Sequence, residues 1–287
     1  MDFFVLNTLN AVSYGAILFL LASGFSLVFG VMGVLNLSHG ALYMVGAYVG
    51  WTIAVKNGLN FWLGALAGGL VAGLISLVME AGFFRRLYQQ LNEQMLLTFG
   101  FVYILDNLAR WIWGPLYKAP FTAPALSGSF SIMGSMYPKV RIAIILIGII
   151  IAIGLWWLQD KTRAGAMIRA GMDDKEIAMA LGINLPLVAT LTFFLGSFIA
   201  GFAGVTGAQL LGVYPEMSIS VMLLVLAVII IGGVGSVQGT LIGAGILGII
   251  DAFGKALFPD YAMFTIYLAM IVVLLIKPSG ILGRQVS

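Results

Sequence analysis

The sequence contains no cysteine and only one histidine, His39, in 287 residues. Disulfides, thiolate metal sites and histidine-rich metal clusters are therefore excluded, and we expect no metal and no cofactor. Charge is also scarce, because 9% of the residues are charged against about 25% in ordinary globular domains. With 61% hydrophobic residues, the outer surface itself must be apolar, so the solvent around it is lipid. The net charge of +3 gives no reason to expect nucleic-acid binding.

The hydrophobic residues occur in long unbroken runs, whereas the strands of a membrane barrel alternate over about ten residues. We predict an all-α polytopic membrane protein in which residues 1–287 form one transmembrane domain, with no soluble domain. About 20 apolar residues are needed for each crossing. The regions near 30–40 and 218–240 are ambiguous, so eight to ten transmembrane helices fit. The predicted spans cover residues 9–30, 38–55, 61–84, 94–113, 140–158, 187–211, 218–234, 239–258 and 261–277.

One charged loop, residues 160–186, interrupts the apolar sequence. It predicts two short helices, the first starting at Arg163 and ending at Gly171. Asp173 is the expected N-cap of the second helix, and Gly182 suits its left-handed C-cap. A small majority of the Lys and Arg residues falls on the side of this loop, which makes it cytoplasmic by the positive-inside rule. The stretch 114–139, rich in Pro, Ser and Gly, becomes an external loop.

The second short helix is amphipathic, with Ile177, Ala178 and Leu181 expected on one face. Two interpretations remain open. The helix docks in a groove on another protein, or it is a connector lying at the lipid headgroups.

Several motifs resemble those of one family of membrane proteins. T-R-A-G (162–165), R-A (169–170) and A-x-x-L-G-I-N (178–184) are similar to the cytoplasmic coupling segment of branched-chain amino-acid ABC-importer permeases of the LivH type. N-L-S-H-G (36–40) and G-G-V-G-S-V-Q-G (232–239) match as well. The resemblance extends over essentially the whole chain, including its length and the order of the motifs.

The resemblance implies a multi-pass subunit of the bacterial inner (cytoplasmic) membrane. Its partners would be a second homologous permease, two cytoplasmic ABC ATPases and a periplasmic substrate-binding protein, with import of branched-chain or other neutral amino acids. A urea or short-amide permease is the alternative within the same class. Carried over by position, the residues that couple to the ATPases would be Thr162, Arg163, Gly165, Arg169, Ala170, Ala178, Leu181, Gly182 and Asn184.

The glycine-rich stretch from Gly232 to Gly239 is not a nucleotide site. No Lys-Ser or Lys-Thr follows at phosphate-loop spacing, and Gly239 comes one residue too late for the dinucleotide fingerprint. A tight turn or a broken helix fits better, and a broken helix leaves backbone groups free to line a polar path. On this basis Gly232, Gly233, Gly235 and Ser236 are candidate path residues. ATP hydrolysis, if ATP is the energy source, is expected on a separate subunit.

Asn36 and His39 lie at the start of a predicted span, where Asn36 or Ser38 could cap the helix. The functional alternative places Asn36 and His39 on the translocation path. Neither they nor other residues form a convergent set of acid, base and nucleophile, so we do not expect an enzyme.

Two predicted spans carry opposite charges four residues apart, Asp106 with Arg110 and Asp251 with Lys255. This spacing puts both charges on one helix face, where each reduces the cost of the other in the membrane. Structural pairing is one interpretation; contact with a substrate or a binding protein is the other. Small residues spaced by four, such as Gly196, Ala200 and Gly204, indicate close helix packing.

Two other functional classes remain open. A secondary transporter would need titratable residues near the membrane midplane, and none is evident in the sequence. A channel would move its substrate passively, without ATP.

Overall fold

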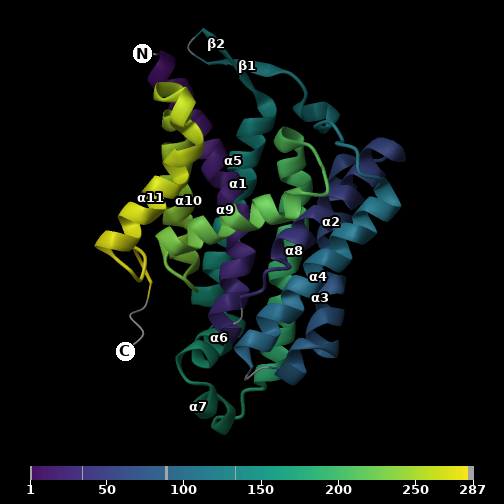
Figure 1. Cartoon of the computed structure of the whole chain (residues 1–287), viewed down its shortest axis with the longest axis vertical. Helices are drawn as coiled ribbons and strands as arrows, with labels where there is room; N and C mark the ends of the chain where they lie inside the picture. The colour runs from purple at the N-terminus through teal and green to yellow at the C-terminus, as the bar shows by residue number, and fades with distance from the viewer. Residues whose placement is uncertain (1, 34, 88–89, 133, 284–287) are drawn as a thin grey trace.

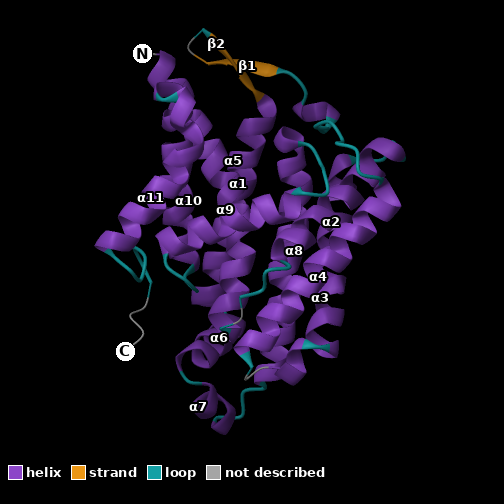
Figure 2. Cartoon of the chain, in the orientation of Figure 1, coloured by secondary structure: helices purple, strands orange, loops and turns teal. Residues whose placement is uncertain are grey.

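The computed structural model describes residues 2–33, 35–87, 90–132 and 134–283. Helices make up almost all of the described chain (Figures 1 and 2). The α-helices are α1 (Asp2–Met32), α2 (His39–Trp51), α3 (Phe61–Gly82), α4 (Leu91–Trp113), α5 (Lys139–Lys161), α6 (Arg163–Asp173), α7 (Lys175–Ala180), α8 (Leu185–Leu211), α9 (Met217–Gly232), α10 (Val237–Leu257) and α11 (Ala262–Ile276). Short helical turns are η1 (Thr52–Lys56), η2 (Phe84–Leu87), η3 (Pro124–Leu126) and η4 (Pro259–Tyr261).

Each of the nine predicted spans overlaps a helix, and the all-helical membrane class is confirmed. Among the described residues, six helices are long and apolar enough to cross a membrane by length and composition: α1, α3, α4, α5, α8 and α10. The other three predicted spans correspond to α2 continued by η1, and to the shorter apolar helices α9 and α11.

The predicted polar loop 114–139 carries a small antiparallel hairpin, β1 (Ser129–Ile132) with β2 (Ser135–Pro138). The hairpin lies at one end of the molecule, and α6 and α7 lie at the other (Figure 1). We call these the hairpin end and the loop end.

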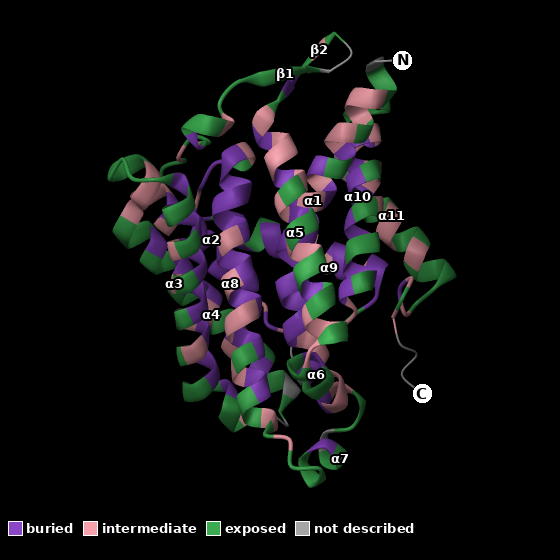
Figure 3. Cartoon of the chain, turned by 180° about the vertical axis from the view of Figure 1, so that it is seen from behind, coloured by how far each residue is buried: buried purple, intermediate pink, exposed green. Residues whose placement is uncertain are grey.

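The chain is built around α1 and α8. Of the most apolar 18 residues of α1, 78% are buried within the chain, against 17% for α5. Helix α8 packs against α1, α2 and α3, while α3, α4 and α5 carry exposed residues along their outer faces (Figure 3). Because the solvent is lipid, these exposed apolar faces are the outer surface of a membrane protein.

Glycines bring the central helices into contact. A Cβ at Gly24 of α1 would collide with the backbone of Gly196 in α8. A Cβ at Gly46 of α2 would collide with Gly201, and one at Gly201 would meet Gly68 of α3. The small-residue spacing in α8 therefore serves helix packing, as membrane interiors require.

Helix α9 runs across the middle of the molecule, at a large angle to α1 and α8 (Figure 1). Residues at the start of α9 contact the two charged side chains of α4, which the prediction had paired with each other. Arg110 Nη2 lies 2.7 Å from Glu216 Oε1, and Ser218 Oγ donates to Asp106 Oδ2 at 2.9 Å. The direct contacts of both side chains are thus made with the α9 region, while the charges of Asp106 and Arg110 still attract each other along α4.

Candidate functional site

The loop end begins with a rigid joint between α5 and α6. Thr162 Oγ1 accepts from the Gly165 amide at 3.1 Å and donates to the Leu158 carbonyl at 2.5 Å. Gly165 lies so close to α5 that a Cβ would collide with the carbonyl oxygens of Leu158 and Gln159. These contacts cap α6 and hold its first turn on the last turn of α5.

Helix α6 has one buried face and one exposed face. Gly165, Ile168 and Gly171 are buried, and α6 contacts α1, α5 and α8. On the other side Arg163 is exposed, while Ala170 is half-buried. Arg169 Nη1 lies 3.6 Å from Asp160 Oδ1, and both side chains are partly exposed. Such an ion pair contributes at most about 1 kcal/mol to the stability of the fold. The first helix continues past Gly171 to Asp173, slightly longer than predicted.

The cap of α7 is Asp174 and not Asp173. Asp174 Oδ1 accepts from the amides of Glu176 at 2.9 Å and Ile177 at 3.0 Å, while Asp173 is the last residue of α6. Because α6 extends two residues past Gly171, the N-cap position of α7 falls one residue later than expected.

The other end of α7 follows the prediction. Gly182 has φ +83°, its amide donates to the Met179 carbonyl at 2.9 Å, and the Ile183 amide donates to the Ala178 carbonyl at 3.1 Å. This is a Schellman ending, which favours glycine.

Helix α7 presents apolar side chains away from the protein. Ala178 is buried, at 1% exposure, whereas Ile177 is 59%, Met179 53% and Leu181 75% exposed. We call these three exposed residues the α7 ridge. The expected common face therefore splits, with Ala178 turned inward and Ile177 and Leu181 turned outward. Figure 3 shows α7 at the far end of the molecule, with most of its residues exposed.

The loop passes directly into α8. Asn184 Oδ1 accepts from the Leu187 amide at 3.1 Å and so caps α8. One turn later Thr190 Oγ1 lies 2.7 Å from Glu80 Oε2 of α3, and Arg85 Nη2 lies 3.0 Å from the same hydroxyl. The start of α8 is therefore capped by the end of the loop and tied to α3 through this cluster.

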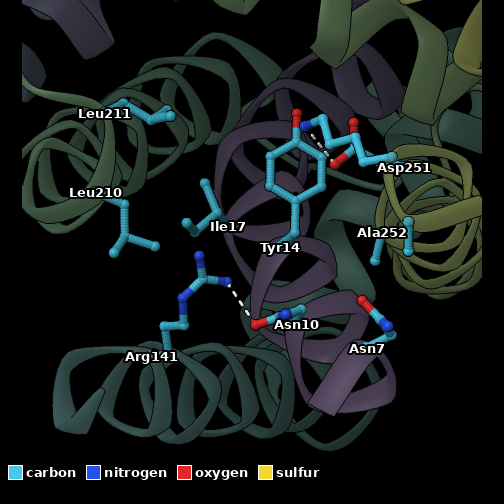
Figure 4. A pocket seen from close by; sticks show the side chains of 11 residues that line it. Asn7, Asn10, Tyr14, Ile17, Arg141, Leu210, Leu211, Asp251 and Ala252 are labelled. Atoms are coloured by element: carbon cyan, nitrogen blue, oxygen red, sulfur yellow. Dashed lines mark hydrogen bonds and ion pairs between the residues drawn. The ribbon is translucent and has the colours of Figure 1, made fainter. Parts of the chain in front are cut away.

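A polar cavity of about 410 Å³ lies at the hairpin end, between α1, α5, α8 and α10. Figure 4 shows side chains from these four helices lining it. Its polar and charged lining comprises Asn7, Asn10, Tyr14, Arg141, Asp251 and Lys255, and its apolar lining Ile17, Leu210, Leu211, Ala252 and Ala256.

Two of the three charged residues in the cavity, Asp251 and Lys255, form an ion pair, whereas Arg141 contacts a neutral side chain. Arg141 Nη1 donates to Asn10 Oδ1 at 3.0 Å. Lys255 Nζ lies 2.7 Å from Asp251 Oδ2 and 5.2 Å from the ring centroid of Tyr14. The predicted pairing of Asp251 with Lys255 is thus confirmed. Asp251 is 6% exposed, so its carboxylate is nearly buried. This carboxylate on α10 and the Arg141 guanidinium on α5 both line the cavity.

The N-L-S-H-G motif is buried in the molecule rather than on this cavity. Asn36 and His39 are each 1% exposed. Asn36 Oδ1 accepts from the Ser38 amide at 3.2 Å, which forms the turn before α2. His39 Nε2 lies 3.0 Å from the Leu21 carbonyl oxygen. Asn36 Nδ2 and His39 Nδ1 are buried and have no hydrogen-bond partner among the described residues, and a role on the translocation path stays a prediction for both.

The glycine-rich motif forms a tight turn between α9 and α10. Gly233 and Gly235 have φ +106° and +77°, and Ser236 Oγ accepts from the Gly239 amide at 3.0 Å to cap α10. The Gly232 carbonyl accepts from the Leu282 amide at 2.9 Å, so the C-terminal segment covers the turn. None of these residues lines the polar cavity, and their place on a path likewise stays a prediction. Among the described residues, no group of three His, Asp or Glu is arranged to hold a metal ion.

Residues 7–274 match the family described as the permease component of the branched-chain amino acid transport system. The chain belongs to this permease family. The permease is 28% identical to the LivH branched-chain amino acid permease protein of Salmonella typhimurium, over 98% of this chain and 96% of the relative. It is 28% identical to BraD of Pseudomonas aeruginosa over 96% of this chain and 94% of the relative.

A second kind of relative is LivM of Escherichia coli, a permease protein of the same named transport system. It is 25% identical over 96% of this chain and 70% of LivM. Among solved structures, PsaBC from Streptococcus pneumoniae superposes with a TM-score of 0.54 at 14% identity, over 96% of this permease and 91% of that chain. At this low identity, the likeness to PsaBC concerns the fold alone. Together with the six apolar helices, these findings make the chain a multi-pass membrane transport subunit.

Most of the polar residues in the cavity of the permease were not predicted from the sequence. A signal was available, because Asn7, Asn10 and Tyr14 recur at three- and four-residue steps and lie on one face of a helix. Arg141 gave no such signal, since it precedes an apolar run and looks like an ordinary flanking charge.

Proposed function

We propose that this permease is one of two membrane subunits of an ATP-driven importer for branched-chain and other neutral amino acids in the bacterial inner membrane. It forms the translocation path together with a second, homologous permease. Two cytoplasmic ATPases drive it through residues 162–184, and a periplasmic binding protein delivers the substrate. The relatives named for branched-chain amino acids support this substrate class. Their LivM counterpart, also similar to this chain, supports a paired permease.

The observation that carries the coupling role is the α7 ridge. Apolar side chains on α3 or α5 are covered by lipid, but α7 is a six-residue helix at the end of the molecule, beyond the long helices (Figure 1). Three apolar side chains, more than half exposed, form a small surface that a groove on an ATPase would bury. The capped joints on both sides of the loop favour movement as a rigid unit.

The mechanism follows from those joints. Closure of the ATPase pair displaces α7, and the displacement reaches α5 through Thr162 and Gly165 and α8 through Asn184. Because α8 packs against α1, α2 and α3, the permease responds as a body. Two such bodies would rock between outward-open and inward-open arrangements, a known repertoire for rigid helix assemblies.

Co-purification tests the coupling. Ile177→Asp together with Leu181→Asp places charge on the ridge without touching the core, so the variant folds. Leu116→Asp is a matched control, because Leu116 is 72% exposed and follows α4 in the polar stretch that leads to the hairpin, away from the loop end. We expect wild type and L116D to retain the ATPase and the second permease in mild detergent. The ridge variant should retain the second permease and lose the ATPase.

Transport in proteoliposomes separates the remaining classes. Labelled leucine uptake that needs ATP and the binding protein supports the importer. Uptake driven by an ion gradient without ATP would indicate a secondary transporter, and passive flux of the chain alone would indicate a channel. Competition by urea or acetamide, but not by leucine or valine, would replace the amino-acid assignment with the amide alternative.

A further inference from the structure

We propose that the polar cavity at the hairpin end binds the zwitterionic head group of the transported amino acid. In this arrangement Asp251 accepts from the α-ammonium group and Arg141 donates to the α-carboxylate. The proposal rests on the proposed function, because it names the site in this chain at which an importer for amino acids would hold its substrate.

The first support is the charge arrangement. Asp251 is 6% exposed, and Lys255, its ion-pair partner, has a side chain that is 60% exposed. A carboxylate buried near a membrane is costly unless it is well paired, and a partner held in solvent compensates it incompletely. The ammonium group of an amino acid, entering from the cavity, adds a second positive charge at the carboxylate.

Arg141 supplies the opposite charge. Its Nη1 atom is held by Asn10 at 3.0 Å, which fixes the orientation of the guanidinium. Arginine presents several donors in one plane, and this geometry matches a carboxylate. Figure 4 shows Arg141 and Asp251 reaching toward the cavity from different helices, with Tyr14 and Ile17 between them.

The apolar wall gives the site its preference. Ile17, Leu210 and Leu211 line the cavity on the side away from Asp251, next to Arg141. A branched aliphatic side chain can therefore bury its surface there while the head group meets the charges. The cavity volume of about 410 Å³ falls in the range of about 300–1,000 Å³ for small-molecule sites.

Helix α8 links this site to the α7 ridge. The same helix begins at Asn184, directly after α7, and ends at Leu211, in the wall of the cavity. Arg141 lies on α5 and Asp251 on α10. The apolar wall and the charged groups therefore belong to the body that the α7 ridge would displace, so its movement against the second permease would open the site inward and release the substrate.

Ligand-dependent thermal unfolding of the purified complex tests the proposal without the binding protein. The ligands are L-leucine, leucinamide, which lacks the carboxylate, and 4-methyl-2-oxopentanoate, which lacks the ammonium group. The variants are Asp251→Asn and Arg141→Gln. Arg110→Gln is the control, because Arg110 also forms an ion pair at the hairpin end but lies outside the cavity.

We expect leucine to stabilise the wild type. Either cavity variant should raise the leucine concentration for half-maximal stabilisation about tenfold or more, the loss of one charge-assisted contact. R110Q should leave it unchanged. Leucinamide should respond to D251N and not to R141Q, and the oxo acid should show the reverse pattern.

Three results would overturn the proposal: no leucine-dependent stabilisation of wild type up to the solubility limit, wild-type behaviour of both cavity variants, or equal binding of leucine and its two analogues. If the variants fail to fold, the ranking of the three ligands on wild type decides. If no ATPase co-purifies, the proposed function fails, but the isolated full-length chain still reports on the cavity.

Discussion

Helices α7 and α8 are neighbours in the chain and opposites in the structure. Helix α8 packs against three other helices through glycines at which a Cβ would collide with backbone atoms. Helix α7 buries Ala178 and exposes three larger apolar side chains. Both helices carry apolar side chains, so the presence of apolar residues alone does not tell a surface that packs inside the protein from one that stays exposed. What distinguishes them is position: α8 lies inside the bundle, whereas α7 lies beyond the ends of the long helices.

The largest effect is expected when a glycine of α8 is replaced by a larger residue, which tests whether α8 is tightly packed. A Cβ in Gly201→Ala would meet the Gly68 carbonyl and lie 2.6 Å from the Ala72 Cβ. We expect a loss of about 2–3 kcal/mol, because helix backbones must move apart. Thermal unfolding in detergent measures it. Gly100→Ala is the control, since no atom lies within 4 Å of a Cβ there; an equal loss in both variants would mean that α8 is not tightly packed.

A second prediction concerns the anchor of α8 on α3. Glu80 is fully buried, and its Oε2 lies 2.7 Å from Thr190 Oγ1. Glu80→Ala should lower the free energy of unfolding by about 2 kcal/mol, because it removes the carboxylate that Thr190 and Arg85 contact. Glu80→Gln should cost less. The exposed Arg86→Ala is the control, and a Glu80→Ala protein as stable as this control would contradict the anchor.

A smaller, local effect is expected at the end of α7. Gly182→Ala forces a side chain into φ +83°, at a cost of about 1–2 kcal/mol. Amide hydrogen exchange should become faster at residues 182 and 183, whose amides form the Schellman hydrogen bonds. Exchange in α8 should stay slow. Gly154→Ala, a helical glycine of α5 with open space around it, should change neither. Faster exchange throughout α8 would show that the two helices are not independent.

The smallest effect on stability is expected for a residue of the α7 ridge, and it separates folding from docking most clearly. Leu181→Ser should change the stability by less than about 0.5 kcal/mol, because the side chain is 75% exposed. The same variant should weaken retention of the ATPase in co-purification. A large loss of stability would place Leu181 in the folded core of this subunit, and an unchanged retention would remove it from the docking surface.

Much of the loop end was predictable because its signals are local. Gly182 ends α7 and the loop consists of two short helices, as the sequence indicates. The error at Asp173 and Asp174 is of one residue, and arises because two adjacent Asp residues have the same capping chemistry. Local pattern also predicted the pairing of Asp251 with Lys255, since both lie on one helix.

The contacts that the sequence did not predict join partners that are distant in the chain. Arg110 pairs with Glu216, more than a hundred residues away, rather than with Asp106. Arg141 and Asn10 likewise meet only through the packing of α5 on α1. No helical period relates such residues, so sequence reasoning could not bring them together.

By itself, the sequence determined the solvent, the helices and the exposed charged loop, because composition and periodicity act over a few turns of chain. The tertiary structure alone decided which charges share a cavity, which glycines meet, and which apolar side chains of α7 stay exposed. Those outcomes depend on contacts between helices, and a contact between helices is a property of their packing and not of either sequence segment.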